Sequence, residues 1–177
     1  MKAIETKLKG CFILEPTIFE DSRGYFFEAF SKAKFEQLTG ANADFVQDNQ
    51  SKSSYGVVRG LHQQIGEFAQ AKLVRVLEGR VLDVAVDVRA GSPTYGEHVA
   101  VELSAENNRQ LYIPRGFLHG FSVLSVTATF FYKCDNVYNK ASEDGVHPLD
   151  KTLAVDWQIP FDKMILSDKD REARAFI

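Results

Sequence analysis

Two of the four histidines lie inside apolar stretches, where an imidazole can act as a base in a dry pocket. His62 follows a strand-like start in VVRGLHQQ (57–64), and His119 lies in IPRGFLHGF, where two glycines flank an aromatic-rich stretch. A neutral imidazole is suited to proton transfer near pH 7, and glycines let a backbone bend closely past a ligand or another strand. For a lone histidine of this kind, the alternative is a hydrogen-bonded structural role.

Strict alternation brings two further reactive side chains onto inward rows. Lys72 shares its face with Val74 and Val76, and Tyr132 shares its face with Phe130 and a cysteine. A buried lysine is rare unless it is paired, so Lys72 either extends its ammonium group outward at the rim of a barrel or lines a polar pocket in the barrel mouth.

The order Arg59, Gly60, His62 poses a geometric problem. Ideal alternation puts His62 on one face of the strand with Gly60, and puts Arg59 on the other face with Leu61. If Arg59 and His62 both face one cavity, Gly60 must mark a bulge or sharp bend that redirects one of them. Alternatively, Arg59 is a solvated surface residue and Gly60 has no special role.

Other kinds of chemistry find little support in the spacing of the candidate residues. A metal site on a barrel generally needs three or more protein ligands, and the chain has no H-x-H or H-x-x-x-H pair. There is no G-x-S-x-G segment for a serine hydrolase, and no base lies beside Cys134 in the sequence. We therefore expect no metal and keep metal-dependent oxidation as a minor alternative.

The elements that must position these residues are mostly β-strands. In RVLDVAVDVR, Leu82, Val84 and Val86 share one face, which predicts a half-buried strand. The same rhythm runs through AKLVRVL, HVAVEL, RQLYI and TFFYKCD, between turn clusters at Glu78-Gly79, AGSPTYG and SAENN. This spacing predicts an antiparallel sandwich or a jelly-roll barrel.

Helix signals are few. Ser31 and Gly40 bracket the segment KAKFEQLT as a possible N-cap and C-terminal stop, and DKDREAR near the end could form one polar turn. Neither segment is long enough to cover a sheet. The chain shows no internal repeat and no linker-like stretch, and its 177 residues favour a single domain spanning residues 1–177.

Composition excludes several classes of partner. The net charge is −3, and lysines and arginines are scattered singly. The sequence therefore has no basic patch that would predict binding to nucleic acid. The two cysteines, Cys11 and Cys134, lie in apolar runs, as is usual for reduced thiols. The N-terminal segment has four consecutive apolar residues, too few for a signal peptide or a membrane span. We therefore expect a cytoplasmic protein that does not bind membranes.

The longest motifs resemble one family of sugar-nucleotide enzymes. RGLHQQ, AQAKLVRVLEGRVLDVAVDVRAGSPTYG, LSAENNRQLYIPRGFLHGFSVLS, FFYKCDNVY and ILSDKD, together with EDSRGYFFE and VQDNQSKS, are similar to the dTDP-4-dehydrorhamnose 3,5-epimerases over nearly the whole chain. The resemblance implies an all-β, cupin-type jelly-roll with a few short peripheral helices, a homodimer and no metal or organic cofactor. It also implies epimerisation of a 4-keto-6-deoxyhexose carried on a nucleoside diphosphate, with dTDP as the expected carrier.

The implied chemistry gives each inward residue a role. A ketone at C4 acidifies the hydrogens on C3 and C5, and inversion needs a base on one face of the sugar and an acid on the other. By resemblance, His62 is the base, Tyr132 is the acid and Asp170 orients His62. Lys72 stabilises the enolate at the C4 oxygen, and His119 hydrogen-bonds the same oxygen or a neighbouring hydroxyl. Without the resemblance, Asp170 reads as a solvated carboxylate in a polar tail.

The same resemblance assigns nucleotide contacts. Arg23 and Arg59 match the cations that bind the pyrophosphate, since arginine suits bidentate phosphate contacts. The remaining ligand-contacting positions of the family fall on five residues of this chain: Glu28, Gln47, Asn49, Tyr138 and Glu143. A strand around CFIL, exposed at the N-terminus, is a natural element to exchange between two subunits.

One segment departs from the family pattern. Many members carry a tryptophan after Glu-x-Gly, whereas this chain reads EDGVHPLD with His147 near that place. The segment is closer to relatives from other deoxysugar pathways, some of which invert C3 alone. The alternatives are therefore a C3-only epimerase, a cupin-type ketoisomerase or a non-catalytic sugar-nucleotide binder.

Overall fold

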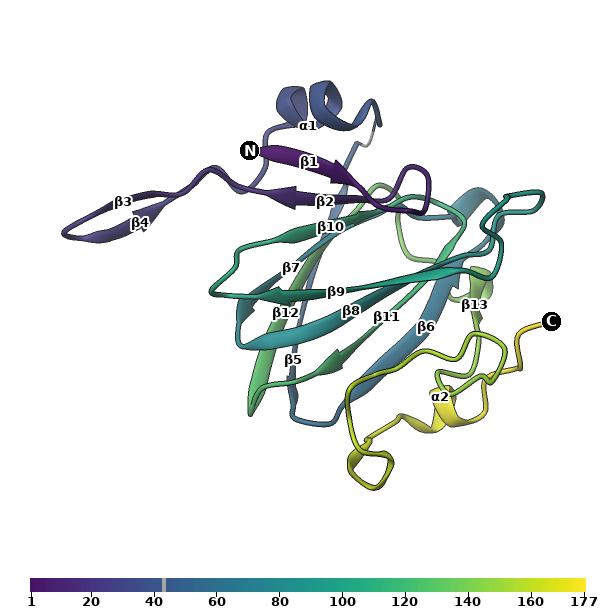
Figure 1. The fold of residues 1–177 in the computed structure, drawn as a ribbon. Helices are drawn as coiled ribbons and strands as arrows, with labels where there is room; N and C mark the ends of the chain where they lie inside the picture. Colours follow the sequence, from purple (N-terminus) through teal and green to yellow (C-terminus); the bar gives the residue numbers. More distant parts are fainter. Residues whose placement is uncertain (43) are drawn as a thin grey trace.

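Two antiparallel sheets face each other in the computed structural model, which describes residues 1–42 and 44–177 (Figure 1). One sheet has the order β1 (Lys2–Glu5), β2 (Phe12–Glu15), β10 (Gln110–Ile113), β7 (Lys72–Glu78), β12 (Thr127–Cys134) and β5 (Gln47–Ser54). The other has the order β13 (Glu143–Gly145), β6 (Val58–Gln64), β11 (Phe117–Val123), β8 (Arg80–Asp87) and β9 (His98–Ser104). This arrangement confirms the predicted all-β jelly-roll.

The inner faces of the two sheets share one apolar core. It includes Val74 and Phe130 from the six-stranded sheet, and Ala85 and Phe121 from the five-stranded sheet. The rings of Phe121 and Phe130 stack across the interior with centroids 4.2 Å apart. The rows that alternation assigned to the interior in β7 and β12 are therefore buried between the two sheets.

Strand β8 corrects one prediction, because it is buried on both faces. Its outer residues Leu82, Val84 and Val86 pack against Trp157 and other apolar residues of the chain beyond the last strand. The Trp157 ring donates its N–H to the carbonyl of Pro148, which anchors this covering segment. The prediction of a half-buried strand was wrong because the polar-looking face with Asp83 and Ala85 lies inside the barrel, while a later segment covers the apolar face.

Short helices lie at the edges of the barrel. Helix α1 (Lys32–Thr39) matches the predicted segment and ends at Gly40 in the left-handed conformation. Ser31 occupies its N-cap position, but the Ser31 side chain makes no capping hydrogen bond. Helix α2 (Asp168–Arg171) is one turn, capped by Ser167. Three 3-10 turns complete the helical elements: Gly66–Phe68, Lys140–Ser142 and Phe161–Lys163.

Helix α1 packs Phe35 against the outer face of the six-stranded sheet, whereas α2 lies beside β6 (Figure 1). Within the described part of the chain, no helix is long and apolar enough to cross a membrane. Cys11 and Cys134 are buried free thiols, as the apolar runs around them predicted.

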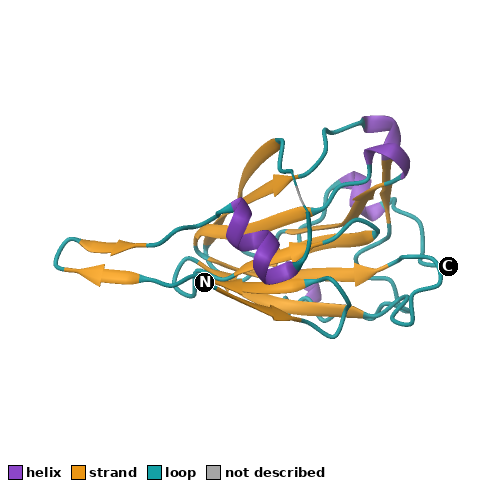
Figure 2. Cartoon of the chain, turned by 90° about the horizontal axis from the view of Figure 1, so that it is seen from above, coloured by secondary structure: helices purple, strands orange, loops and turns teal. Residues whose placement is uncertain are grey.

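The N-terminal region differs from expectation. Strand β2, which contains most of CFIL, is hydrogen-bonded on both sides, to β1 and to β10, so it is not an exposed strand. The exposed element is instead the hairpin of β3 (Phe19–Asp21) and β4 (Gly24–Phe26), which extends away from the barrel in both views (Figures 1 and 2). The sequence pattern did not predict the edge strand β5, because its residues QDNQSKSS are polar on both faces.

Candidate active site

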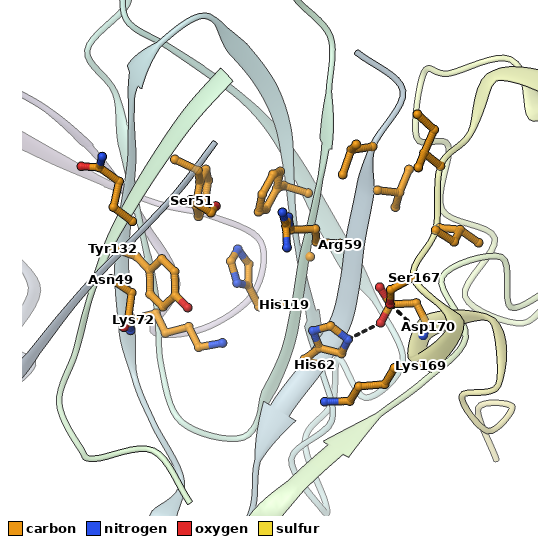
Figure 3. Close-up of a pocket in the computed structure, with 18 residues that line it drawn as sticks. Asn49, Ser51, Arg59, His62, Lys72, His119, Tyr132, Ser167, Lys169 and Asp170 are labelled. Atoms are coloured by element: carbon orange, nitrogen blue, oxygen red, sulfur yellow. Dashed lines mark hydrogen bonds and ion pairs between the residues drawn. The ribbon is translucent and has the colours of Figure 1, made fainter. Parts of the chain in front are cut away.

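A cavity of about 610 Å³ opens between the two sheets and beside the α2 segment (Figure 3). Its lining combines residues from β5, β6, β7, β11 and β12 with residues 165–170. Seven of the residues expected in the site border it: Asn49, Arg59, His62, Lys72, His119, Tyr132 and Asp170. The fold thus gathers side chains separated by up to about 120 positions in the sequence.

Gly60 solves the geometric problem of strand β6. Arg59 and His62 both line the cavity, although they are three residues apart. Gly60 has φ +136°, the Gly60–Leu61 peptide is cis, and the pairing of β6 with β11 shifts register here. A Cβ on Gly60 would lie 2.6 Å from the Cα of Gly120, so the two strands approach closely where glycines permit it. The predicted break in the pleat at Gly60 is confirmed.

His62 and Asp170 form a close pair. The Nε2 atom of His62 lies 2.5 Å from Oδ1 of Asp170, which is only 3 % exposed (Figure 3). Burial alone would raise the pKa of Asp170, but the hydrogen bond and charge of His62 outweigh burial and hold that pKa below its ordinary value. With Nε2 occupied, Nδ1 is the nitrogen of His62 left for a substrate.

His119 is the direct cross-strand neighbour of His62, on β11. Its Nε2 atom lies 2.8 Å from Oδ1 of Asp83, a residue of β8 with no exposed surface. Burial lowers the pKa of His119 below the ordinary histidine value, against the opposing effect of the Asp83 charge. The imidazole is therefore neutral near pH 7.

Lys72 and Tyr132 face the histidines from the opposite sheet. The Lys72 ammonium lies 5.8 Å from the centroid of the Tyr132 ring, and both side chains point into the cavity (Figure 3). Burial lowers the pKa of Lys72 and raises the pKa of Tyr132. The inward orientation predicted from alternation is confirmed for both, and Lys72 does not extend to a solvated rim.

The cavity continues into a polar edge. Ser53 accepts hydrogen bonds of 3.1 Å from both Nε and Nη2 of Arg59, which directs the exposed guanidinium. Gln47 donates to Asn49 on β5 and accepts from the backbone N–H of Tyr138, so it adjoins the cavity without lining it. This edge offers hydrogen-bond donors and acceptors, together with the exposed ring of Tyr138.

A second group of polar side chains borders the cavity near α2. Lys169 lines it and holds Glu143 at 2.6 Å, which places Glu143 next to the site. His147 instead accepts a hydrogen bond from the backbone of Leu149 and does not line the cavity. The segment that departs from the family pattern therefore lies outside the cavity wall.

Two expected site residues are not brought to this cavity. Arg23 lies in the turn of the β3–β4 hairpin, where its exposed guanidinium pairs with Asp21. Glu28 pairs with Lys34 of α1. Within one chain, the structure therefore separates these two residues from the other candidates.

Sequence reasoning missed other residues of the site. Asp83 lies on the face of RVLDVAVDVR opposite to Leu82 and Val84, and it became recognisable only once that face proved to be interior. Ser53, Ser167 and Lys169 are recognisable only through their contacts, because polar residues on an edge strand or a one-turn helix carry no pattern. Among residues 1–42 and 44–177, no three His, Cys, Asp or Glu side chains cluster as metal ligands would.

Comparison with known proteins agrees with the geometry of the cavity. Residues 5–177 match the family model described as dTDP-4-dehydrorhamnose 3,5-epimerase. The dTDP-4-dehydrorhamnose 3,5-epimerase of Shigella flexneri is 50% identical over 177 residues, covering 100% of this chain and 97% of the relative.

Solved structures of 3,5-epimerases are similar to this chain over nearly its whole length. The crystal structure of the corresponding enzyme from Elizabethkingia anophelis NUHP1 is 62% identical with a TM-score of 0.97, covering 99% of this chain and 96% of that one. A dTDP-6-deoxy-D-glucose-3,5-epimerase from Legionella pneumophila, solved with dTDP-4-keto-L-rhamnose, is 49% identical with a TM-score of 0.94, covering 98% and 92%. The chain belongs to the dTDP-4-dehydrorhamnose 3,5-epimerase family and is an epimerase acting at C3 and C5 of a dTDP-linked sugar.

Proposed function

We propose that His62 is the base and Tyr132 the acid that invert C3 and C5 of a dTDP-linked 4-keto-6-deoxyhexose. One observation carries the assignment: His62, which is paired with Asp170, and Tyr132 come from opposite sheets and border the same cavity. A sugar ring held between them would present one face to each group. Removal of a proton on one face and delivery on the other inverts the carbon.

The intermediate between the two proton transfers is an enolate with negative charge on the C4 oxygen. Lys72 is the cation available to that oxygen, because its ammonium points into the same enclosed space. Electrostatic stabilisation is strong in such a space, since little water screens the charge. His119 is assigned to a second polar contact with the sugar.

The nucleotide would lie along the polar edge of the cavity. Arg59 is directed by Ser53 and suits a bidentate contact with the pyrophosphate. Asn49 and Gln47 offer amides to the base or sugar, and the exposed Tyr138 ring offers a flat surface for stacking. Glu143 would contact a hydroxyl of the ligand.

We further propose a homodimer in which the β3–β4 hairpin completes the partner's cavity. The hairpin extends away from its own barrel (Figure 1) and exposes Phe19, Tyr25 and Phe26 by 61 to 70 %. Exposed aromatic clusters of this kind mark interaction sites. A hairpin inserted into the partner would bring Arg23 and Glu28 to the pyrophosphate and base of the ligand. This arrangement would explain why both residues lie away from the cavity of their own chain.

Residues 1–177 would act as one jelly-roll epimerase domain in the cytoplasm. The two free cysteines support a reducing compartment, because Cys11 and Cys134 are buried but remain unpaired. The proposed mechanism uses side chains alone and calls on no metal or organic cofactor.

Solvent-exchange measurements test the catalytic roles. With dTDP-4-keto-6-deoxyglucose in deuterated water, the unaltered enzyme should incorporate deuterium at C3 and C5. His62→Ala should lose exchange at both carbons, whereas Tyr132→Phe should retain some exchange but lose inversion, because only delivery from the opposite face is removed. Equal loss of exchange in the two variants would contradict the assigned roles.

Mixing two inactive variants tests the dimer. A mixed dimer of His62→Ala and Arg23→Ala chains contains one site with an intact histidine and an intact hairpin arginine, so refolding the two together should restore activity that neither shows alone. Failure to regain activity in dimers verified by light scattering would refute the exchanged hairpin.

A further inference from the structure

Asp83 is a carboxylate enclosed in the barrel interior that no step above uses. It has no exposed surface, and its Oδ1 atom lies 2.8 Å from Nε2 of His119. Its other oxygen, Oδ2, is buried without a hydrogen-bond partner among the described residues. Buried carboxylates are costly unless they are compensated, and buried polar atoms nearly always find a partner. The interior must therefore supply a compensating charge.

Lys72 contributes positive charge to this interior, because its side chain lies in the cavity and the charge of Asp83 acts on it. The charge of Asp83 raises the pKa of Lys72 and so opposes the dominant, lowering effect of burial. Burial and the positive charge of Lys72 both lower the pKa of His119, which keeps the imidazole beside Asp83 neutral.

The contact with Asp83 determines which nitrogen of His119 carries the proton. A carboxylate can only accept hydrogen bonds, so Nε2 must donate its proton to Oδ1. A neutral imidazole has one N–H, which leaves Nδ1 as a bare acceptor. Nδ1 makes no hydrogen bond within the described chain and is not fully buried, so it keeps access to the cavity that His119 lines.

We propose that Asp83 is a positioning residue that holds His119 in the tautomer with a bare Nδ1 facing the cavity, so that His119 accepts a hydrogen bond from a hydroxyl of the sugar ring. The C4 oxygen is then left to Lys72. This inference rests on the proposed function of the cavity, and it decides between the two contacts open to His119.

The His62–Asp170 and His119–Asp83 pairs therefore have different roles. The His62 side chain is 37 % exposed and can reach a reacting carbon, whereas the His119 side chain is 8 % exposed and held from within the barrel. An acceptor cannot stabilise an enolate oxygen, which needs donors or positive charge. His119 therefore orients the sugar, and its loss should weaken binding more than turnover.

Nitrogen-15 NMR of the unaltered protein tests the tautomer without substrate. Long-range proton–nitrogen correlation distinguishes a protonated from a bare ring nitrogen, and a His119→Asn spectrum assigns the signals. We expect His119 to carry its proton on Nε2 alone at pH 7. A proton on Nδ1, or on both nitrogens, would overturn the proposal whether or not the catalytic roles proposed for His62 and Tyr132 hold.

A double-mutant cycle tests whether Asp83 acts through His119. Asp83→Asn can donate to Nε2, which should move the proton to Nδ1 and lower kcat/KM about tenfold, equivalent to about 1.4 kcal/mol, mainly by raising KM. In a His119→Asn background, the same substitution should cause no further loss, because the positioned group is already gone. Losses that multiply in the double variant would show that Asp83 acts independently of His119 and would refute the proposal.

Discussion

Replacing Asp170 with asparagine would keep the size of the side chain and remove the charge that faces His62. The carboxylate lies 2.5 Å from Nε2 of His62 and is 3 % exposed, so water cannot substitute for it. The asparagine amide can donate to Nε2, which would leave the ring proton on Nδ1. Nδ1 is the atom assigned to remove the substrate proton, so the favoured tautomer of the variant is the wrong one.

The size of the effect follows from that contact. A hydrogen bond to a charged group contributes about 1.5 to 3 kcal/mol, and about 1.4 kcal/mol corresponds to a tenfold change, which gives about 10- to 150-fold. The wrong tautomer adds to this loss, and the whole contribution of a general base, about 10² to 10⁴-fold, is the upper limit. We therefore expect Asp170→Asn to lower the exchange rate roughly 10²-fold or more.

The assay is deuterium incorporation at C3 and C5, followed by NMR with saturating substrate. Asp168→Asn is the matched control, because Asp168 is an exposed acid on the same helix and makes no side-chain hydrogen bond to the cavity. The control should exchange like the unaltered enzyme. If the exchange rate of Asp170→Asn stays within about threefold of the rate of the control, a change well below about 1.4 kcal/mol, then Asp170 does not orient the base.

Further predictions concern the cation, the bend and a buried carboxylate. Lys72→Met should lower kcat about 10² to 10³-fold in steady-state assays. Because burial lowers the pKa of Lys72, the alkaline limb of the unaltered enzyme's pH profile should lie below the ordinary pKa of lysine. Gly60→Ala should lower the melting temperature and the activity together, since φ is +136° and the new Cβ would meet Gly120 at 2.6 Å; a variant as stable and active as the parent would contradict this. Asp87 accepts hydrogen bonds from Arg89 and two hydroxyls, so Asp87→Asn should lower the unfolding free energy by about 2 to 4 kcal/mol in urea titrations. The folded-state pKa of Asp87 is lower than its ordinary value, so the stabilisation by Asp87 is present above about pH 4 and is lost as the pH falls towards the folded-state pKa. If the difference in unfolding free energy between the unaltered protein and Asp87→Asn grew on acidification, the prediction would be refuted.

Several features of the fold could be predicted because they depend on local pattern. Period-two alternation identified β7, β8 and β12, and so put Lys72 and Tyr132 on inward rows. The segment 32–39 is helical as predicted and ends at Gly40. Even the break at Gly60 was predictable, since a regular strand cannot direct residues three apart to the same side.

Other features depended on which segments meet in three dimensions. The outer face of β8 is buried because residues near Trp157, about seventy positions later, fold over it. The pairing of Asp83 with His119 arises where β8 lies beside β11, and no spacing in the sequence reveals that contact. Likewise, Ser53 directs Arg59 from a polar edge strand that has no hydrophobic signal.

The sequence by itself thus determined the all-β class, the rows that face inward and the family, because alternation and long ordered motifs are properties of the chain. Only the tertiary structure decided that Asp83 holds His119, and that Arg23 lies on a hairpin remote from the cavity of its own chain. The physical reason is that hydrogen bonds and charges act over a few ångströms in space. Those distances are set by how the sheets and the C-terminal segment pack, and not by separation along the chain.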